Sequence, residues 1–257
     1  MEKILTNGLY LWQFENLRKE TSLRHFVTDR NTNPQGNEFT LSYSSLPDKS
    51  EIKSNRDLLA TAMGIDDSHL YMPSQVHKTR ILHVMKGTPK EELKDTDALI
   101  TNEPGICIAV MSADCVPVLL YDKDNKAIAA IHSGWRGTVA KILEKTLHKM
   151  NHLFGTTGEN LIACIGPSVS QPSYEVGEEV MNAVHESFEN SHALLHHHAD
   201  KKAKLDLWKA NEHQLTAFGV PPSQIEISDL CTVINNNYFF SARKGDTGRF
   251  AAGIMLV

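Results

Sequence analysis

A cysteine and a histidine stand at adjacent ends of two neighbouring apolar runs. Cys115 directly precedes the run Val116–Tyr121, and His132 follows the run Ala127–Ile131. Both runs are short and rich in Val, Ile, Leu and Ala, and Asp122–Lys126 between them has the composition of a hairpin turn. We therefore expect two paired, buried strands. A thiol and an imidazole at adjacent ends of such strands can meet in space.

A second histidine, His77, lies upstream between polar and turn residues. With Cys115 and His132 it supplies two nitrogens and one sulfur, a ligand set that suits Zn²⁺, and a catalytic zinc usually has three protein ligands and an open position for water. The same thiol and imidazole can instead serve as a nucleophile and its base. Spacing leaves both interpretations open, because the three residues are far apart in the sequence and a lone cysteine is often a core residue.

Longer motifs surround these residues in a definite order. They are QVH at 75–77, DA at 97–98, ADCVPV at 113–118, HSGWRG at 132–137, GP at 166–167, YEVG at 174–177, CT at 231–232, FFS at 239–241 and TGR at 247–249. The series resembles the YfiH family, also called the multicopper polyphenol oxidase (laccase-like) or purine nucleoside phosphorylase family. The resemblance runs from about residue 25 to the C-terminus, and ADCVPV followed by HSGWRG is its most specific part.

The resemblance implies a Zn²⁺ cofactor on His77, Cys115 and His132. It also implies purine nucleoside chemistry: phosphorolysis of adenosine, inosine, guanosine and methylthioadenosine with phosphate, and deamination of adenosine. Deamination needs an activated water that attacks C6 of the purine, and phosphorolysis needs a phosphate held near C1′. The H-x-E and P-C-x-x-C signature of the nucleobase deaminases is absent, so a deaminase activity would use a different site.

We assign catalytic roles to four residues of the central motifs, namely Cys115, His132, Asp114 and Arg136. Arg136 lies beside the expected start of a helix, where free N–H groups favour phosphate. Asp114 and Gln75 are the nearest polar candidates, by sequence, for orienting the two imidazoles, and Asp114 can equally cap a strand end. Substrate contacts are assigned to Arg30, Arg56, Gln75 and Arg243, although each arginine can instead belong to a plain ion pair.

The pattern of elements favours one α/β domain over residues 1–257, with mixed sheets. Helical spacing is predicted at 55–64, 138–154, 177–188 and 205–218, with glycines at 64, 155 and 219 as stops. Strands are predicted at 81–84, 98–101, 106–111, 161–165, 225–227, 238–240 and 250–257, besides the central pair. The segment 31–45 is expected to be a loop, and it lacks the Gly-Gly turn usual in the family. The resemblance implies an α-β-β-α layered sandwich.

Three consecutive histidines, at 196–198, do not form a second metal site by this reading. Adjacent residues on a helix or strand cannot all face one ion, so we expect an exposed polar loop.

Composition excludes several other classes of function. The net charge of −5 does not favour a nucleic-acid or anionic-membrane surface. There is no apolar run of about 18 residues and no signal-peptide pattern, so we expect no membrane partner. The four cysteines have no paired spacing, which favours reduced thiols in a cytoplasmic setting. The expected partners are small-molecule purine nucleosides and phosphate, with the chain a monomer or a weak homo-oligomer.

Other functions remain as alternatives. A metal-free Cys115–His132 pair predicts amide hydrolysis, and some family members are linked to editing of peptidoglycan precursors. Copper-dependent phenol oxidation would use the same His₂Cys set with Met111 as a weak ligand, but the paired histidine motifs of a trinuclear copper cluster are absent. A purely structural zinc would need a fourth protein ligand, for which Cys107 is the candidate.

Overall fold

Two six-stranded mixed sheets form the centre of the molecule in the computed structural model, which describes residues 1–45, 49–199 and 201–257. The first sheet has the order β1-β2-β3-β15-β7-β4, with bounds Glu2–Thr6, Leu9–Gln13, Leu23–Val27, Phe250–Leu256, Cys107–Ser112 and Leu70–Tyr71. The second has the order β14-β10-β8-β9-β6-β5, with bounds Ile225–Ile227, Leu161–Ile165, Val116–Asp122, Ala127–Ser133, Ala98–Thr101 and Ile81–His83.

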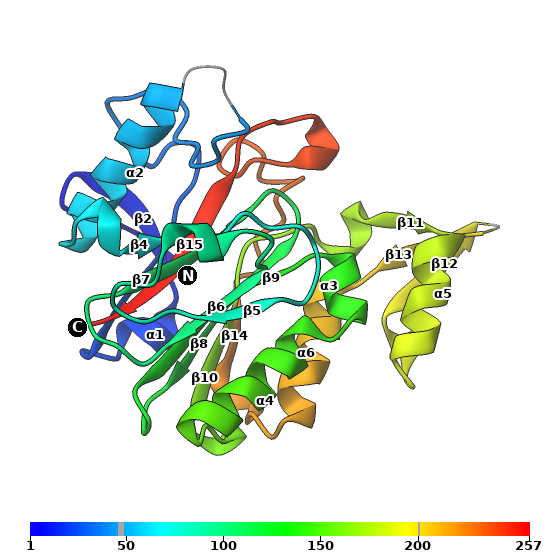
Figure 1. Ribbon diagram of the computed structural model, residues 1–257. Coiled ribbons are helices and arrows are strands. Elements are labelled where there is room, and N and C mark those ends of the chain that lie inside the picture. Colours follow the sequence, from blue (N-terminus) through cyan, green and yellow to red (C-terminus); the bar gives the residue numbers. More distant parts are fainter. Residues whose placement is uncertain (46–48, 200) are drawn as a thin grey trace.

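Helices cover the outer faces of both sheets, which gives four layers (Figure 1). Helix α2 (Lys49–Met63) packs on the first sheet through Leu59 and Met63, and α4 (Ile142–Phe154) and α6 (Leu207–Ala217) pack on the second. A further apolar core fills the space between the sheets. The predicted α-β-β-α sandwich is therefore confirmed.

The remaining elements lie at the ends of these layers. Figure 1 shows a small three-stranded sheet extending to the right of the molecule together with α5. The elements are α1 (Glu15–Arg18), α3 (Trp135–Val139), α5 (Glu178–Ser187), β11 (Glu175–Gly177), β12 (Leu195–Ala199) and β13 (Lys202–Leu205).

The central strands β8 and β9 are apolar except at the ends, where Asp122, His132 and Ser133 lie, because both of their faces are buried. Along β8, Val118 and Leu120 face the core beneath the helices, whereas Leu119 and Tyr121 face the core between the sheets. Burying an aliphatic side chain of this size contributes about 1.5–3 kcal/mol. Because both faces are buried, these strands lack the alternation of polar and apolar residues that is typical of a surface strand. The predicted pair of strands is confirmed, and the two strands are antiparallel.

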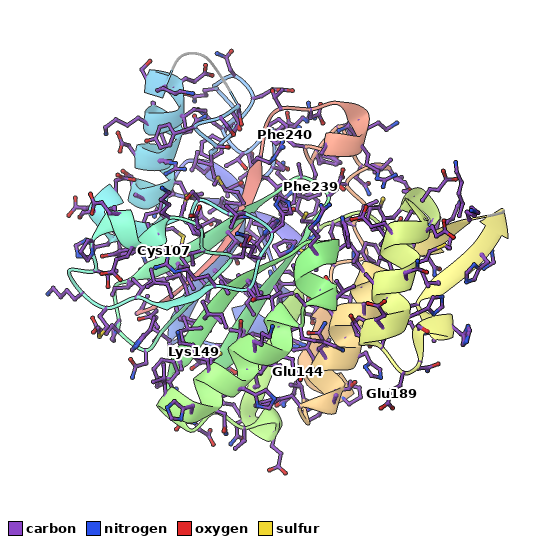
Figure 2. All side chains as sticks on the ribbon, turned by 45° about the vertical axis from the view of Figure 1, so that its right-hand side comes forward. Cys107, Glu144, Lys149, Glu189, Phe239 and Phe240 are labelled. Atoms are coloured by element: carbon purple, nitrogen blue, oxygen red, sulfur yellow. The ribbon has the colours of Figure 1, made fainter. Side chains whose placement is uncertain are left out.

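Three of the sequence predictions are wrong, each for a tertiary reason. The helix expected over 138–154 is divided into α3 and α4, because Lys141 adopts a left-handed conformation with φ 61°. The segment Tyr238–Phe240 is not a strand; Phe239 and Phe240 are buried from an irregular segment, near the top of Figure 2. The histidines at 196–198 lie in β12 rather than in a loop.

Most of the other elements agree with the expectations, although α2 begins at Lys49 rather than at residue 55, and strands β4, β11 and β13 were not predicted. Gly64, Gly155 and Gly219 have positive φ angles at the ends of α2, α4 and α6. The segment 31–45 is irregular. All four cysteines are free thiols. Among the described residues, no helix combines the length and the apolar character needed to cross a membrane.

Gly253, in the middle of β15, provides a test of packing in the first sheet. It pairs with Phe26 on one side and Ala109 on the other, and a Cβ atom there would lie 2.4 Å from Phe26 Cζ and 2.8 Å from Ala109 Cβ. We expect Gly253→Ala to lower the free energy of unfolding by about 1–3 kcal/mol, because neither backbone nor ring has room to move. Chemical denaturation measures the change. Gly177→Ala is the control, since a Cβ there meets no atom within 4 Å, and an equal effect of the two changes would contradict the packing argument.

Candidate metal centre

The strand register brings the thiol and the first imidazole together as expected. Cys115 directly precedes β8, and His132 in β9 pairs with Pro117. His77 approaches from the loop before β5, and its ring centroid lies 4.8 Å from that of His132. The potential ligand atoms of His77, Cys115 and His132 all lie within 4.8 Å of one another.

Burial differs among the three residues, so the site is open on one side. His132 is buried, Cys115 is half-buried and His77 is exposed. No fourth His, Cys, Asp or Glu joins the group within the described ranges of the chain. Cys107, which the sequence offers as a fourth ligand, is fully buried on β7 and is not in the group (Figure 2). Three protein ligands with access from solvent fit a catalytic site better than a closed structural one.

A buried carboxylate that sequence reasoning missed connects the two histidines. Asp97 directly precedes β6, and its Oδ1 lies 2.9 Å from His132 Nδ1. The same carboxylate accepts hydrogen bonds of 2.9 Å from the backbone N–H groups of His77 and Lys78. Burial alone raises the pKa of Asp97, but these hydrogen bonds and the neighbouring His132 lower it overall. The one available signal was the pair Asp97-Ala98 in the family-like motifs, directly before an apolar run.

The backbone beside the carboxylate is held in an uncommon conformation. His77 has φ 61°, in the left-handed region that residues other than glycine seldom occupy. Such conformations persist only where surrounding contacts impose them, and they gather at functional sites. Here the hydrogen bonds to Asp97 supply that constraint.

Because Gly134 has no side chain, there is room beside it for the ligand atoms of Cys115 and His77. A Cβ atom at this position would lie 2.8 Å from Cys115 Sγ and 3.1 Å from His77 Cδ2. Any side chain here would therefore displace two of the three candidate ligands.

Asp114 and Gln75 do not orient the imidazoles. Asp114 accepts hydrogen bonds from Thr232 Oγ1 at 2.5 Å and from the backbone N–H of Arg243 at 2.8 Å, so it ties the C-terminal loop to the start of β8. Gln75 exchanges two hydrogen bonds with the backbone of Met111, at 2.7 and 2.8 Å. Both residues line the cavity described next, but their side chains fix backbone segments.

A cavity of about 670 Å³ opens over the candidate metal ligands. Arg56, Arg243 and Arg249 line it, and none forms an ion pair with a carboxylate in the part of the chain that the structure describes. Their guanidinium groups donate instead to backbone carbonyls: Arg56 to Leu41, Arg243 to Glu175, and Arg249 to its own loop. Three cations without counterions make this cavity suited to an anion.

Two tyrosines place their rings beside these cations. The guanidinium carbon of Arg56 lies 4.3 Å from the Tyr43 ring centroid, and that of Arg243 lies 4.6 Å from the Tyr174 ring centroid. Both tyrosines line the cavity. Arginine over an aromatic face is a favourable arrangement that also holds the guanidinium in place.

Arg30 and Arg136, which the sequence placed at the site, do not line this cavity. Arg30 pairs with Asp246 at 2.7 Å and also with Glu38. Arg136 is exposed, with its guanidinium 4.3 Å from the Trp135 ring and 3.6 Å from Glu179. Sequence adjacency to His132 was misleading for Arg136, because α3 directs its side chain to the surface.

The thiol and the imidazole form a coupled pair in the metal-free chain. Burial raises the pKa of Cys115, but the charge of His132 and hydrogen bonds from His132 and His77 outweigh it and lower the pKa to about 6. Burial lowers the pKa of His132, but the Cys115 thiolate and Asp97 outweigh it and raise the pKa to about 9. A thiolate, an imidazolium and an orienting carboxylate are therefore aligned near neutral pH, an arrangement that can bind a metal or activate a nucleophile.

Asp97→Asn tests whether the carboxylate orients the ligands. We expect the zinc affinity to fall about 10–100-fold, because loss of an orienting carboxylate typically weakens metal binding by this factor. Competition with a chromophoric chelator measures the affinity. Asp95→Asn is the matched control, since Asp95 is exposed and lies outside the ligand group. Equal zinc affinities in the two variants would contradict the assigned role.

In metal-free protein, the rate at which the Cys115 thiolate is alkylated should depend on pH. Because the folded-state pKa of Cys115 is depressed to about 6, alkylation by iodoacetamide should keep its rate from pH 8 down to about 6 and fall below that. The stabilisation that the thiolate contributes is present above the unfolded-state pKa of about 8.5 and is lost progressively as the pH falls from there through about 6. Cys107, whose pKa is raised by burial to about 12, should stay unmodified. Mass spectrometry of the alkylated peptides reports both residues, and a midpoint for Cys115 near the ordinary value of about 8.5 would contradict the coupling.

The chain can now be compared with known proteins. Residues 24–257 match the family model described as multi-copper polyphenol oxidoreductase laccase. The chain is 42% identical over 98% of its length to a protein of Bacteroides thetaiotaomicron named purine nucleoside phosphorylase, 98% of which is covered. It is 36% identical over 76% of its length to adenosine deaminase RL5 of an unknown prokaryotic organism, with 78% of that protein covered. The crystal structure of the YfiH protein of Bacillus licheniformis superposes with a TM-score of 0.88 at 25% identity, covering 98% of this chain and 97% of that one. The predicted family is thereby confirmed, and the chain belongs to the multi-copper polyphenol oxidoreductase laccase family, with the YfiH proteins among its relatives.

Proposed function

We propose that this protein is a zinc-dependent purine nucleoside phosphorylase that also deaminates adenosine. The observation that carries the proposal is that His77, Cys115 and His132 share one cavity with three arginines that form no ion pair with any carboxylate of the described residues. A phosphorylase needs an anion site beside its reaction centre, and unpaired arginines provide one. The names of the relatives support the choice of reaction, since one is called a purine nucleoside phosphorylase and another an adenosine deaminase. The proposed nucleosides are adenosine, inosine, guanosine and methylthioadenosine.

His77, Cys115 and His132 would hold the zinc. Mutual separations within 4.8 Å and a set of two nitrogens and one sulfur fit this ion. Bound zinc supplies Lewis acidity and a water of lowered pKa, which is the chemistry that deamination needs. Asp97 keeps the His132 ring in position by accepting from Nδ1.

The arginines serve phosphorolysis by binding and orienting phosphate. In that reaction a phosphate oxygen forms a bond to C1′ of the ribose, the bond from C1′ to N9 breaks, and its electron pair leaves with the base. Fixed guanidinium groups neutralise the charge of the phosphate and hold it next to the sugar. The rings of Tyr43 and Tyr174 give the cavity flat apolar surfaces on which a purine can stack.

Arg243→Met tests the proposed phosphate contact. We expect kcat/KM for inosine phosphorolysis to fall about 10–100-fold, as for loss of one charge-assisted contact or oriented donor, with the phosphate KM rising most. Release of hypoxanthine in the presence and absence of phosphate measures it. Arg136→Met is the matched control, because Arg136 points to the surface outside the cavity. If Arg136→Met lost as much activity as Arg243→Met, the assignment of the arginines would be wrong.

The thiolate of Cys115 favours one other function. A Cys115–His132–Asp97 series resembles a nucleophile, base and orienting acid, so metal-free protein could hydrolyse an amide, as in editing of peptidoglycan precursors. Removal of zinc separates the two proposals: chelation abolishes nucleoside turnover under the first and leaves or increases amide hydrolysis under the second. A copper-dependent polyphenol oxidase has less support, because the described residues contain a single metal-ligand group of this kind and a trinuclear cluster needs more.

The cytoplasmic setting and the monomeric or weakly associated state stay predictions. The free state of all four cysteines supports the first.

A further inference from the structure

A second cavity of about 460 Å³ adjoins the first. It is lined by residues of α2, β4 and the short 3-10 helix Lys90–Leu93. Arg56, Met72 and Ser74 line both cavities. The second cavity is therefore next to the candidate metal centre, with the Arg56 guanidinium at the boundary.

Arg56 is a half-buried cation that forms no ion pair within the described residues, although the carboxylate of Asp67 lines the same cavity and opposes the lowering of the Arg56 pKa. Its Nε and Nη2 both donate to the carbonyl oxygen of Leu41, at 3.0 and 2.8 Å. Burial lowers the pKa of Arg56. No ion pair joins it to a carboxylate among residues 1–45, 49–199 and 201–257. A half-buried guanidinium whose hydrogen-bond partners are neutral carbonyls can gain a charge-assisted contact from a bound anion.

Lys90 contributes a second cation to the lining of this cavity. Although the residue is exposed overall, its ammonium donates to the carbonyl oxygens of Asp67 and Leu70 and lies 4.0 Å from the Tyr71 ring centroid. Burial lowers the pKa of Lys90 overall; the charge of Asp67 opposes this shift, and the charge of Arg56 adds to it. No described carboxylate forms an ion pair with it.

The whole lining has an excess of positive charge. Arg56, Lys90 and Lys94 stand against the carboxylates of Asp67 and Glu91. The two cations held over backbone carbonyls and aromatic rings are fixed in place, so they lose little rotamer freedom when an anion binds.

We propose that this second cavity binds a phosphate group between Arg56 and Lys90. The group has two possible sources, inorganic phosphate or the phosphoryl group of a phosphorylated nucleoside that extends from the first cavity. Phosphate suits the site because it carries up to two negative charges and accepts from several donors, so it satisfies both cations at once. Its use in catalysis rests on the proposed phosphorylase function, whereas its binding does not.

Lys90→Met is the decisive variant, with Lys86→Met as the matched control. Lys86 is exposed in the same region but does not line the cavity. Binding of inorganic phosphate to zinc-loaded protein is measured by ³¹P NMR at constant ionic strength without any nucleoside. We expect Kd for phosphate to rise about tenfold in Lys90→Met, as for loss of one charge-assisted contact, and to be unchanged in Lys86→Met. Thermal unfolding of both variants verifies that they remain folded.

A second arm compares adenosine with adenosine 5′-monophosphate by calorimetry. If the site takes the phosphoryl group of an ester, Lys90→Met weakens both the monophosphate and inorganic phosphate and leaves adenosine unchanged; if it takes only free phosphate, it weakens inorganic phosphate alone. Unchanged binding of both ligands in Lys90→Met, or no binding of either by the wild type, would overturn the proposal. If phosphate binding depends on Lys90 but the protein cleaves no nucleoside, the proposed phosphorylase function would be wrong, whereas the proposed phosphate site would be supported.

Discussion

The buried carboxylate of Asp97 is the contact on which the candidate metal centre depends. It accepts hydrogen bonds from the His132 ring and from the backbone N–H groups of His77 and Lys78. It therefore ties strand β9 of the second sheet to the loop that carries His77. Without it, buried donors would lose their acceptor, which costs about 1–3 kcal/mol for each group. The left-handed conformation of His77 would also lose its constraint. Asp97 therefore contributes both to the stability of this region and to the positioning of the candidate metal ligands.

The two cavities show how charge is distributed around that centre. One carboxylate, Asp97, lies beneath the ligands, whereas the open side is lined by arginines bonded to backbone carbonyls. Negative charge below favours a metal cation and an imidazolium; positive charge above favours an anionic co-substrate. On the open side the one carboxylate of the lining, Asp114, is already engaged by Thr232 and by the backbone N–H of Arg243, and the arginines leave a net positive charge for an anion.

The sequence predicted the parts of the structure that depend on local pattern. Strands β8 and β9 were predicted because two buried faces require continuous apolar residues, and their hairpin brought Cys115 to His132. The break at Lys141 was missed because a left-handed lysine carries no local signal. Tyr238–Phe240 has strand-like composition, yet Phe239 and Phe240 fill the core from an irregular segment. The part played by Asp97 was missed because it depends on the pairing of β6 with β9, which composition does not reveal. Arg136 was misplaced because a residue next to a ligand in sequence can point away from it in a helix.

The most direct test of the central claim is zinc K-edge X-ray absorption of the purified protein. If His77, Cys115 and His132 hold the ion, the spectrum should contain one sulfur at about 2.3 Å and nitrogen or oxygen neighbours at about 2.0–2.1 Å. In Cys115→Ser the sulfur contribution should vanish. A shell of two or more sulfurs, no sulfur at all, or a wild-type spectrum unchanged by that substitution would contradict the assignment.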